Sequence, residues 1–128
     1  MHHAIFLCFA LLIPLVFLGG CAPSASDAYH KITPQAGHEM MKKEDITLID
    51  VREPAEYQQG HIPGARLIPL GTIDDTVTAK LPDKKKPLIV YCRSGVRSKK
   101  AAMKLVELGY TDVRDMGGIL DWPYEVEK

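Results

Sequence analysis

The chain has 128 residues, of which 46% are hydrophobic and 25% are charged. This length suits one compact domain with its own core and is too short for two. The 16 Lys and Arg residues balance 16 Asp and Glu residues, so neither net charge nor a basic tract indicates binding to nucleic acid.

The N-terminal segment predicts export. Residues 4–20 contain no charged side chain and are rich in Leu, Phe, Ile and Val, yet they are slightly short for a spanning helix, which needs about 20 residues. The segment ends in the tetrapeptide LGGC, which resembles a bacterial lipobox, where the cysteine (here Cys21) becomes lipidated and N-terminal after cleavage. An uncleaved anchor is the alternative, because His2 and His3 stand where Lys or Arg is usual.

These features define the expected organisation of the chain. We expect a lipoprotein signal peptide at 1–20, a lipidated Cys21 with a flexible tether at 21–28, and one domain at 29–128. Either interpretation of the N-terminus places the domain outside the cytoplasmic membrane as a membrane-anchored protein. After processing, Cys21 would carry the lipid and the domain would hold a single cysteine, Cys92, so no internal disulfide is expected.

Strand-like and helix-like segments alternate along the rest of the chain. Apolar runs predict strands near Ile32 and at 46–51, 67–68, 88–91 and 113–114. Amphipathic patterns predict helices at 35–42, 54–59, 72–81 and 98–108, the last ended by Gly109. This alternation predicts an α/β fold in which a parallel sheet is covered by helices on both faces.

The segment CRSGVRS at 92–98 joins a predicted buried strand to a predicted helix. It places Cys92 at the carboxyl end of a strand, where ligands bind in open α/β sheets. Amide groups at the helix start, together with Arg93 and Arg97, favour a thiolate, and Gly95 allows the backbone to turn inward. We therefore expect an ionised, exposed thiol; a buried, inert cysteine is the alternative.

Four segments, in the expected order, resemble the signatures of the rhodanese-like sulfurtransferase family. Residues 92–98 resemble its active-site loop, and DVRE at 50–53 resembles its first signature. GHIPGA at 60–65 resembles the second, and Gly117-Gly118 followed by Trp122 resembles the C-terminal one. The resemblance covers about residues 29–125 and implies a three-layer fold with a central parallel five-stranded sheet.

The resemblance implies a persulfide relay. The Cys92 thiolate would attack the outer sulfur of a small anionic donor such as thiosulfate, and the persulfide would pass its sulfur to cyanide, a thiol or a protein. No metal or organic cofactor is expected, and a monomer is expected. The implied substrate-binding residues are the rest of the loop: Arg93, Ser94, Gly95, Val96, Arg97 and Ser98. Arg93 would receive the donor, whereas Arg97 would anchor the loop.

Two other functions fit the same fold. Phosphatases and arsenate reductases that resemble this family carry one more loop residue, which widens the cradle for a tetrahedral oxyanion. Here Cys92 and Arg97 enclose four residues, which favours transfer of a sulfur atom. The other alternative is a non-enzymatic persulfide carrier or binding module, which the presence of Cys92 disfavours.

The remaining signature residues are assigned supporting roles. Asp50 either accepts hydrogen bonds from an arginine or backbone N–H that supports the loop, or caps the helix at 54–59. Arg52 supports the site and is interpreted as a structural partner of Glu53. His61 is interpreted as a turn histidine with a satisfied ring, and Trp122 as packing the C-terminal segment onto the core.

Overall fold

The computed structural model describes residues 25–128. The predicted signal peptide, the predicted lipid site at Cys21 and the first part of the tether therefore lie outside the described residues. The last four tether residues form a single helical turn, α1 (Ala25–Ala28), in which Ala28 is buried. Within the described part of the chain, no helix has both the length and the apolar character needed to cross a membrane.

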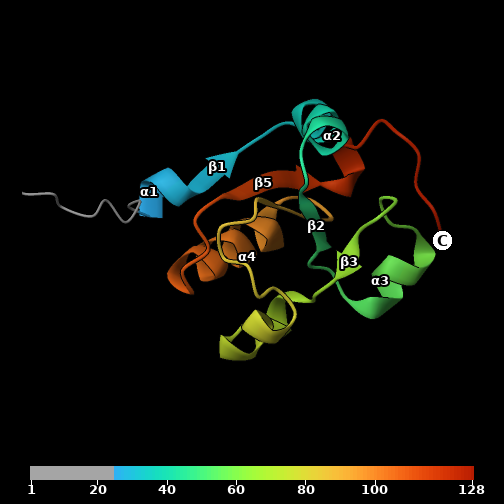
Figure 1. The fold of residues 1–128 in the computed structure, drawn as a ribbon. Coiled ribbons are helices and arrows are strands. Elements are labelled where there is room, and N and C mark those ends of the chain that lie inside the picture. Colours follow the sequence, from blue (N-terminus) through green and yellow to red (C-terminus); the bar gives the residue numbers. More distant parts are fainter. Residues whose placement is uncertain (1–24) are drawn as a thin grey trace, which may run out of the picture.

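A five-stranded parallel sheet forms the centre of the molecule (Figure 1). Its strand order is β1-β5-β4-β2-β3, so β4 lies in the middle with a neighbour on each side. The predicted parallel sheet is thereby confirmed. The strands are β1 (Tyr29–Lys31), β2 (Thr47–Asp50), β3 (Arg66–Leu67), β4 (Leu88–Cys92) and β5 (Val113–Gly118).

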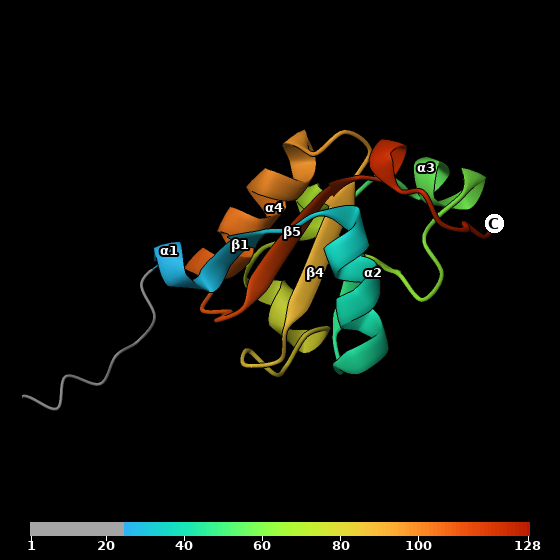
Figure 2. The ribbon, with the colours of Figure 1, turned by 90° about the horizontal axis from the view of Figure 1, so that it is seen from above.

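Helices cover both faces of this sheet, as predicted. α2 (Pro34–Lys43) lies on one face and α4 (Val96–Glu107) on the other (Figure 2). The short helix α3 (Pro54–Gln59) follows β2. α4 ends close to where expected, because Gly109 takes a left-handed conformation (φ 98°) after the C-cap residue Leu108, and the Tyr110 N–H donates to the Leu105 carbonyl.

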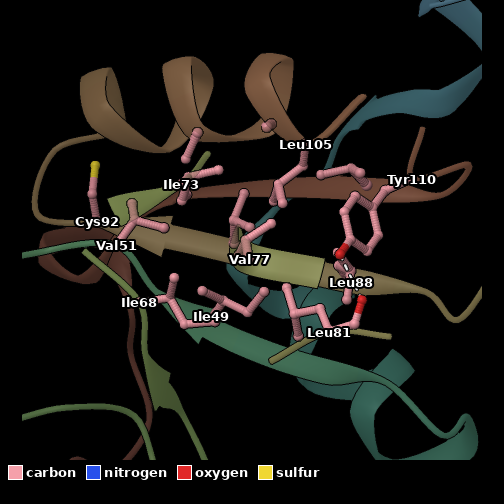
Figure 3. Packing of buried hydrophobic residues seen from close by; sticks show 14 residues of the cluster. Ile49, Val51, Ile68, Ile73, Val77, Leu81, Leu88, Cys92, Leu105 and Tyr110 are labelled. Carbon is pink, nitrogen blue, oxygen red and sulfur yellow. Dashed lines mark hydrogen bonds between the residues drawn. The ribbon is translucent and has the colours of Figure 1, made fainter. Parts of the chain in front are cut away.

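The central strand β4 supplies residues to two hydrophobic clusters. Leu88, Val90 and Cys92 belong to the cluster beneath α4, which Figure 3 shows, whereas Ile89 and Tyr91 belong to the cluster beneath α2. All five β4 residues are buried, as expected for a strand covered on both faces. The strand that carries Cys92 is therefore held rigidly along its whole length.

The predicted helix at 72–81 is wrong. Two short 3-10 helices, η1 (Leu70–Thr72) and η2 (Asp75–Ala79), lie in this region instead. The Asp74 carboxylate accepts hydrogen bonds from the Thr76 amide and hydroxyl, an arrangement that competes with a continuous helix. The apolar residues whose spacing suggested a helix are nevertheless buried. Three of them belong to the hydrophobic cluster beneath α4: Ile73, Val77 and Leu81.

Candidate active site

The thiol of Cys92 lies at the end of β4, where the chain turns into α4. The Gly95 N–H donates a hydrogen bond to Cys92 Sγ at 3.0 Å. Cys92 is only 1% exposed, so the expectation of an exposed thiol is wrong. The cause is tertiary, because β4 lies between β2 and β5 and its last side chain packs into the core beneath α4.

The loop after Cys92 has the geometry of an anion cradle. Gly95 adopts φ 104°, in the left-handed region that favours glycine, and α4 begins at the next residue. The first amide groups of a helix have no partner inside it and carry partial positive charge. The predicted turn at Gly95 is therefore confirmed, and it directs the Gly95 N–H at Cys92 Sγ.

A buried carboxylate that the sequence analysis did not identify holds the end of this loop by hydrogen bonds. Asp115, at 1% exposure, accepts hydrogen bonds from the Ser98 hydroxyl at 2.7 Å, the Gly117 N–H at 3.0 Å and the Tyr29 hydroxyl at 2.8 Å. Ser98 Oγ also lies 3.0 Å from the Gly95 carbonyl oxygen. Ser98, predicted to bind substrate, is thus fully buried, and it ties the start of α4 to β5. The Asp115 position in β5, two residues before the paired glycines, was the available signal.

The paired glycines let β5 approach the Cys92 loop. Gly118 lies across from Cys92 in the β4–β5 register. A Cβ atom at Gly118 would overlap the Arg93 carbonyl oxygen and lie 2.6 Å from its carbon and 2.7 Å from Ser94 Cα. The Leu120 N–H donates to the same Arg93 carbonyl at 3.3 Å. The C-terminal signature therefore shapes the loop by close backbone contact.

Arg97 is joined to Glu56 of α3 by a two-pronged ion pair. Its Nη1 and Nη2 atoms lie 2.6 and 2.9 Å from Glu56 Oε1 and Oε2. Hydrogen bonding by Arg97 lowers the pKa of Glu56 to about 2. This pair ties Arg97, the residue expected to anchor the loop, to α3. It also adds Glu56, which lies 41 positions away in sequence and which the motif analysis missed.

Asp50 accepts hydrogen bonds from Arg52 and from Tyr91 of β4, so it is the acceptor that one of its two predicted roles requires, whereas its support of the Cys92 loop stays a prediction. Arg52 donates from Nε to Oδ1 at 3.0 Å and from Nη2 to Oδ2 at 2.7 Å, and its backbone N–H donates to Oδ1 at 2.9 Å. The hydroxyl of Tyr91 donates to Oδ2 at 2.8 Å. Burial raises the pKa of Tyr91, so this hydroxyl remains a neutral donor.

The other interpretations at this corner are wrong. Asp50 does not cap α3; the helix begins at Pro54, and the Glu56 side chain accepts the Glu53 N–H at 3.2 Å. Arg52 does not pair with Glu53, because the buried Asp50 carboxylate lies two residues away on the same turn and takes its guanidinium. Local geometry thus selects the buried acceptor over the exposed one.

A cavity of about 530 Å³ opens beside the loop. Arg93 is exposed at its edge and, within residues 25–128, its guanidinium has no hydrogen-bond or ion-pair partner. Cys92 does not line this cavity, but the next residue in the sequence, Arg93, does. The lining residues are Arg52, Glu56, Gln59, Gly60, Arg93, Ile119 and Leu120.

His61 and Trp122 have structural roles, as predicted. The His61 ring stacks on Tyr57 at 3.7 Å, with Nδ1 3.0 Å from the Tyr57 carbonyl oxygen and Nε2 3.4 Å from Glu127. Trp122 packs against the cluster beneath α2, and its Nε1 donates to the Glu125 carbonyl at 3.0 Å. Among the residues that the structure describes, no three His, Cys, Asp or Glu side chains gather as a metal site would require.

Comparison with known proteins identifies the family. The Rhodanese-like domain profile matches residues 33–124. Thiosulfate sulfurtransferase PspE of Escherichia coli (strain K12) is 44% identical over 73 residues, which cover 57% of this chain and 70% of PspE. Thiosulfate sulfurtransferase GlpE of Pseudoalteromonas translucida is 40% identical over 85 residues, covering 66% and 79%.

Solved structures agree with this assignment. A structure described as a rhodanese with anions from E. coli superposes with a TM-score of 0.62 at 39% identity, covering 66% of this chain and 99% of that one. The protein therefore belongs to the rhodanese-like family. Its relatives support sulfurtransferase activity at the level of the family.

Proposed function

We propose that this protein transfers sulfane sulfur from thiosulfate, or a similar donor, to a thiophilic acceptor through a persulfide on Cys92. The observation that carries the proposal is the Gly95 N–H aimed at Cys92 Sγ at the start of α4, beside a cavity whose Arg93 guanidinium has no partner among residues 25–128. Relatives named thiosulfate sulfurtransferase support the choice of donor. Cyanide, a thiol or a protein thiol would serve as the acceptor.

The first half-reaction forms one S–S bond and breaks another. The Cys92 thiolate attacks the outer sulfur of thiosulfate, whose S–S bond breaks with its electron pair leaving on sulfite. The new persulfide carries the negative charge on its terminal sulfur. The Gly95 amide at Cys92 Sγ stabilises the attacking thiolate, and the positive end of α4 stabilises the persulfide charge without a general base. The acceptor then attacks the terminal sulfur and restores the thiolate.

The surrounding residues divide into binding and supporting roles. Arg93 draws the anionic donor to the cavity edge, since its exposed guanidinium has no partner in the described part of the chain and can bind oxygen atoms. Arg97 and Ser98 hold the loop through Glu56 and Asp115. Because Cys92 is 1% exposed, transfer requires a movement that uncovers Sγ.

Mass spectrometry of the full chain tests this proposal. Incubation with thiosulfate should add one sulfur atom to the peptide that contains Cys92, and subsequent cyanide should remove it as thiocyanate. Cys92→Ser should abolish both the adduct and thiocyanate formation. Hydrolysis of a phosphoryl ester without any persulfide would instead support the phosphatase alternative.

We also propose that the domain is tethered outside the cytoplasmic membrane by a lipid on Cys21. The uncharged apolar segment at 4–20 and the LGGC tetrapeptide support this proposal. Cys21→Ala should block both lipid labelling and cleavage of the precursor in cells. Continued labelling of the variant would contradict it.

A further inference from the structure

The chain enters the domain at the end of the sheet that lies opposite the thiol. α1 comes directly before β1 and packs against α4, and its Ala28 is buried, so the start of the described chain is held to the domain. All five strands run parallel. The chain therefore enters at the amino end of the sheet, whereas Cys92, the last residue of β4, lies at the carboxyl end.

The proposed lipid would keep this amino end close to a membrane. Three residues separate Cys21 from Ala25, so the Cα atoms of these two residues are at most about 15 Å apart. An uncleaved anchor at 4–20 would lengthen this connection by a single residue. Charged side chains that extend from the amino end toward the membrane then come within the Debye length of the headgroups, about 8 Å at physiological ionic strength.

Basic side chains gather at the amino end of the sheet. Residues 80–86 precede β4 and contain four lysines and one aspartate, a net charge of +3. Arg66 begins β3, and its exposed guanidinium has no hydrogen-bond or ion-pair partner among residues 25–128. The Thr111 N–H donates to the Lys84 carbonyl at 3.0 Å, which joins the segment to the turn before β5, the neighbour of β1. We call residues 80–86 together with Arg66 the basic end.

A cavity of about 230 Å³ opens within the basic end. Arg66, Lys80 and Lys86 contribute positive charge to its lining. Two carboxylates oppose them, because Asp83 also lines the cavity and Asp45 lies 3.2 Å from the Lys86 ammonium group. Arg66 and Lys80 therefore remain to bind the oxygen atoms of an anion such as a phosphodiester.

The opposite end of the molecule carries negative charge. Residues 119–128 follow β5 and contain three carboxylate side chains and one lysine, a net charge of −2. Figures 1 and 2 show α1 and the C-terminus on opposite sides of the molecule. A negatively charged membrane attracts the basic end and repels residues 119–128, so both charges favour the same orientation.

We propose that the basic end docks onto anionic phospholipid headgroups of the membrane that carries the tether, and that this orientation turns the Cys92 loop away from the bilayer. The inference rests on the proposed tether and is independent of the chemistry of sulfur transfer. Donor and acceptor then reach Cys92 from the aqueous phase. Each Lys or Arg close to an anionic membrane surface strengthens the association about fivefold.

The reactivity of individual lysines in the full chain tests this docking. The membrane-extracted protein is added to preformed phosphatidylcholine vesicles with or without phosphatidylglycerol, and acetylation by an uncharged reagent is followed by mass spectrometry. Lys80 and Lys85 are exposed and should react about fivefold more slowly on the anionic vesicles. Lys100 and Lys128, also exposed, should react equally on both. About 1 M salt should remove the difference, because it shortens the Debye length to about 3 Å.

A reversal of charge tests the cavity itself. Arg66→Glu should remove most of the protection of Lys80 and Lys85. The matched control, Lys100→Glu, changes the net charge of the protein equally and should keep the protection, because this lysine lies on α4. Equal loss of protection in both variants would show that overall charge attracts the membrane, and the inference would fail. Protection of Lys80 by soluble glycerol phosphate without vesicles would assign the cavity to a free phosphate ester and would also overturn it.

The outcomes separate this inference from the proposed functions. If the full chain is not recovered with membranes, the proposed tether fails and the docking fails with it. If the protein is anchored but Lys80 and Lys85 react equally on both kinds of vesicle, the tether stands and the inference fails. Formation of the Cys92 persulfide is tested separately and is unaffected by either result.

Discussion

Replacing Gly118 by alanine should displace the Cys92 loop with little strain at the substituted residue itself. Gly118 has φ −114° and ψ 147°, an extended conformation open to any residue. Its new methyl carbon would lie 2.7 Å from Ser94 Cα, whereas carbon atoms in contact normally lie about 3.5–4.0 Å apart. The loop must therefore move by about 1 Å.

A movement of this size has calculable consequences. Overpacking costs about 1–3 kcal/mol of folding free energy, measurable as a lower midpoint of urea unfolding. A misplacement of about 1 Å at the Gly95 amide should lower the turnover number on the order of 100-fold, because Cys92 Sγ loses its aligned donor. The assay is thiocyanate formation from thiosulfate and cyanide.

The control for this experiment is Gly71→Ala, since a Cβ atom at Gly71 would have no neighbour within 4 Å. This variant should keep the wild-type rate and unfolding midpoint. If Gly118→Ala proved as active as Gly71→Ala, the close contact between Gly118 and the loop would have no part in holding the cradle, and the reasoning would fail.

Three further predictions concern polar and charged residues in and beneath the site. Arg93→Ala should raise the KM for thiosulfate about tenfold with an unchanged urea midpoint, since its guanidinium is exposed and unpaired within residues 25–128; an unchanged KM refutes its role. Tyr91→Phe removes a buried donor to Asp50 and should cost about 1–3 kcal/mol in urea unfolding; a smaller loss would show that water replaces the hydroxyl. The lowered pKa of Glu56, about 2 when folded, means that its pairing with Arg97 stabilises the protein above about pH 4.5 and is lost as the pH falls toward 2. Glu56→Gln should therefore show a shallower loss of stability over that range, and parallel curves for the two proteins would contradict this.

Local sequence signals were sufficient for most of the framework. Buried strands such as β4 are continuous apolar runs, and Gly109 marks the end of α4 by a conformation that other residues avoid. The Cys92 loop was recognisable because its residues are contiguous. The helix predicted at 72–81 failed because apolar spacing records which side chains are buried, whereas the hydrogen bonds of Asp74 determine the backbone there.

The partners of the loop could not be found in this way. Glu56 and Arg97 are 41 positions apart, and Ser98 and Asp115 are 17 apart, so their contacts exist only after β2, β4 and β5 pair in parallel. The sequence alone established the buried strands, the cysteine loop and its glycine turn, since each depends on residues that are close in sequence, and the alternation of strands with helices predicted that the strands pair in parallel. The burial of Cys92 and the compensation of its nearby arginines depend on packing between distant segments, which no local pattern records.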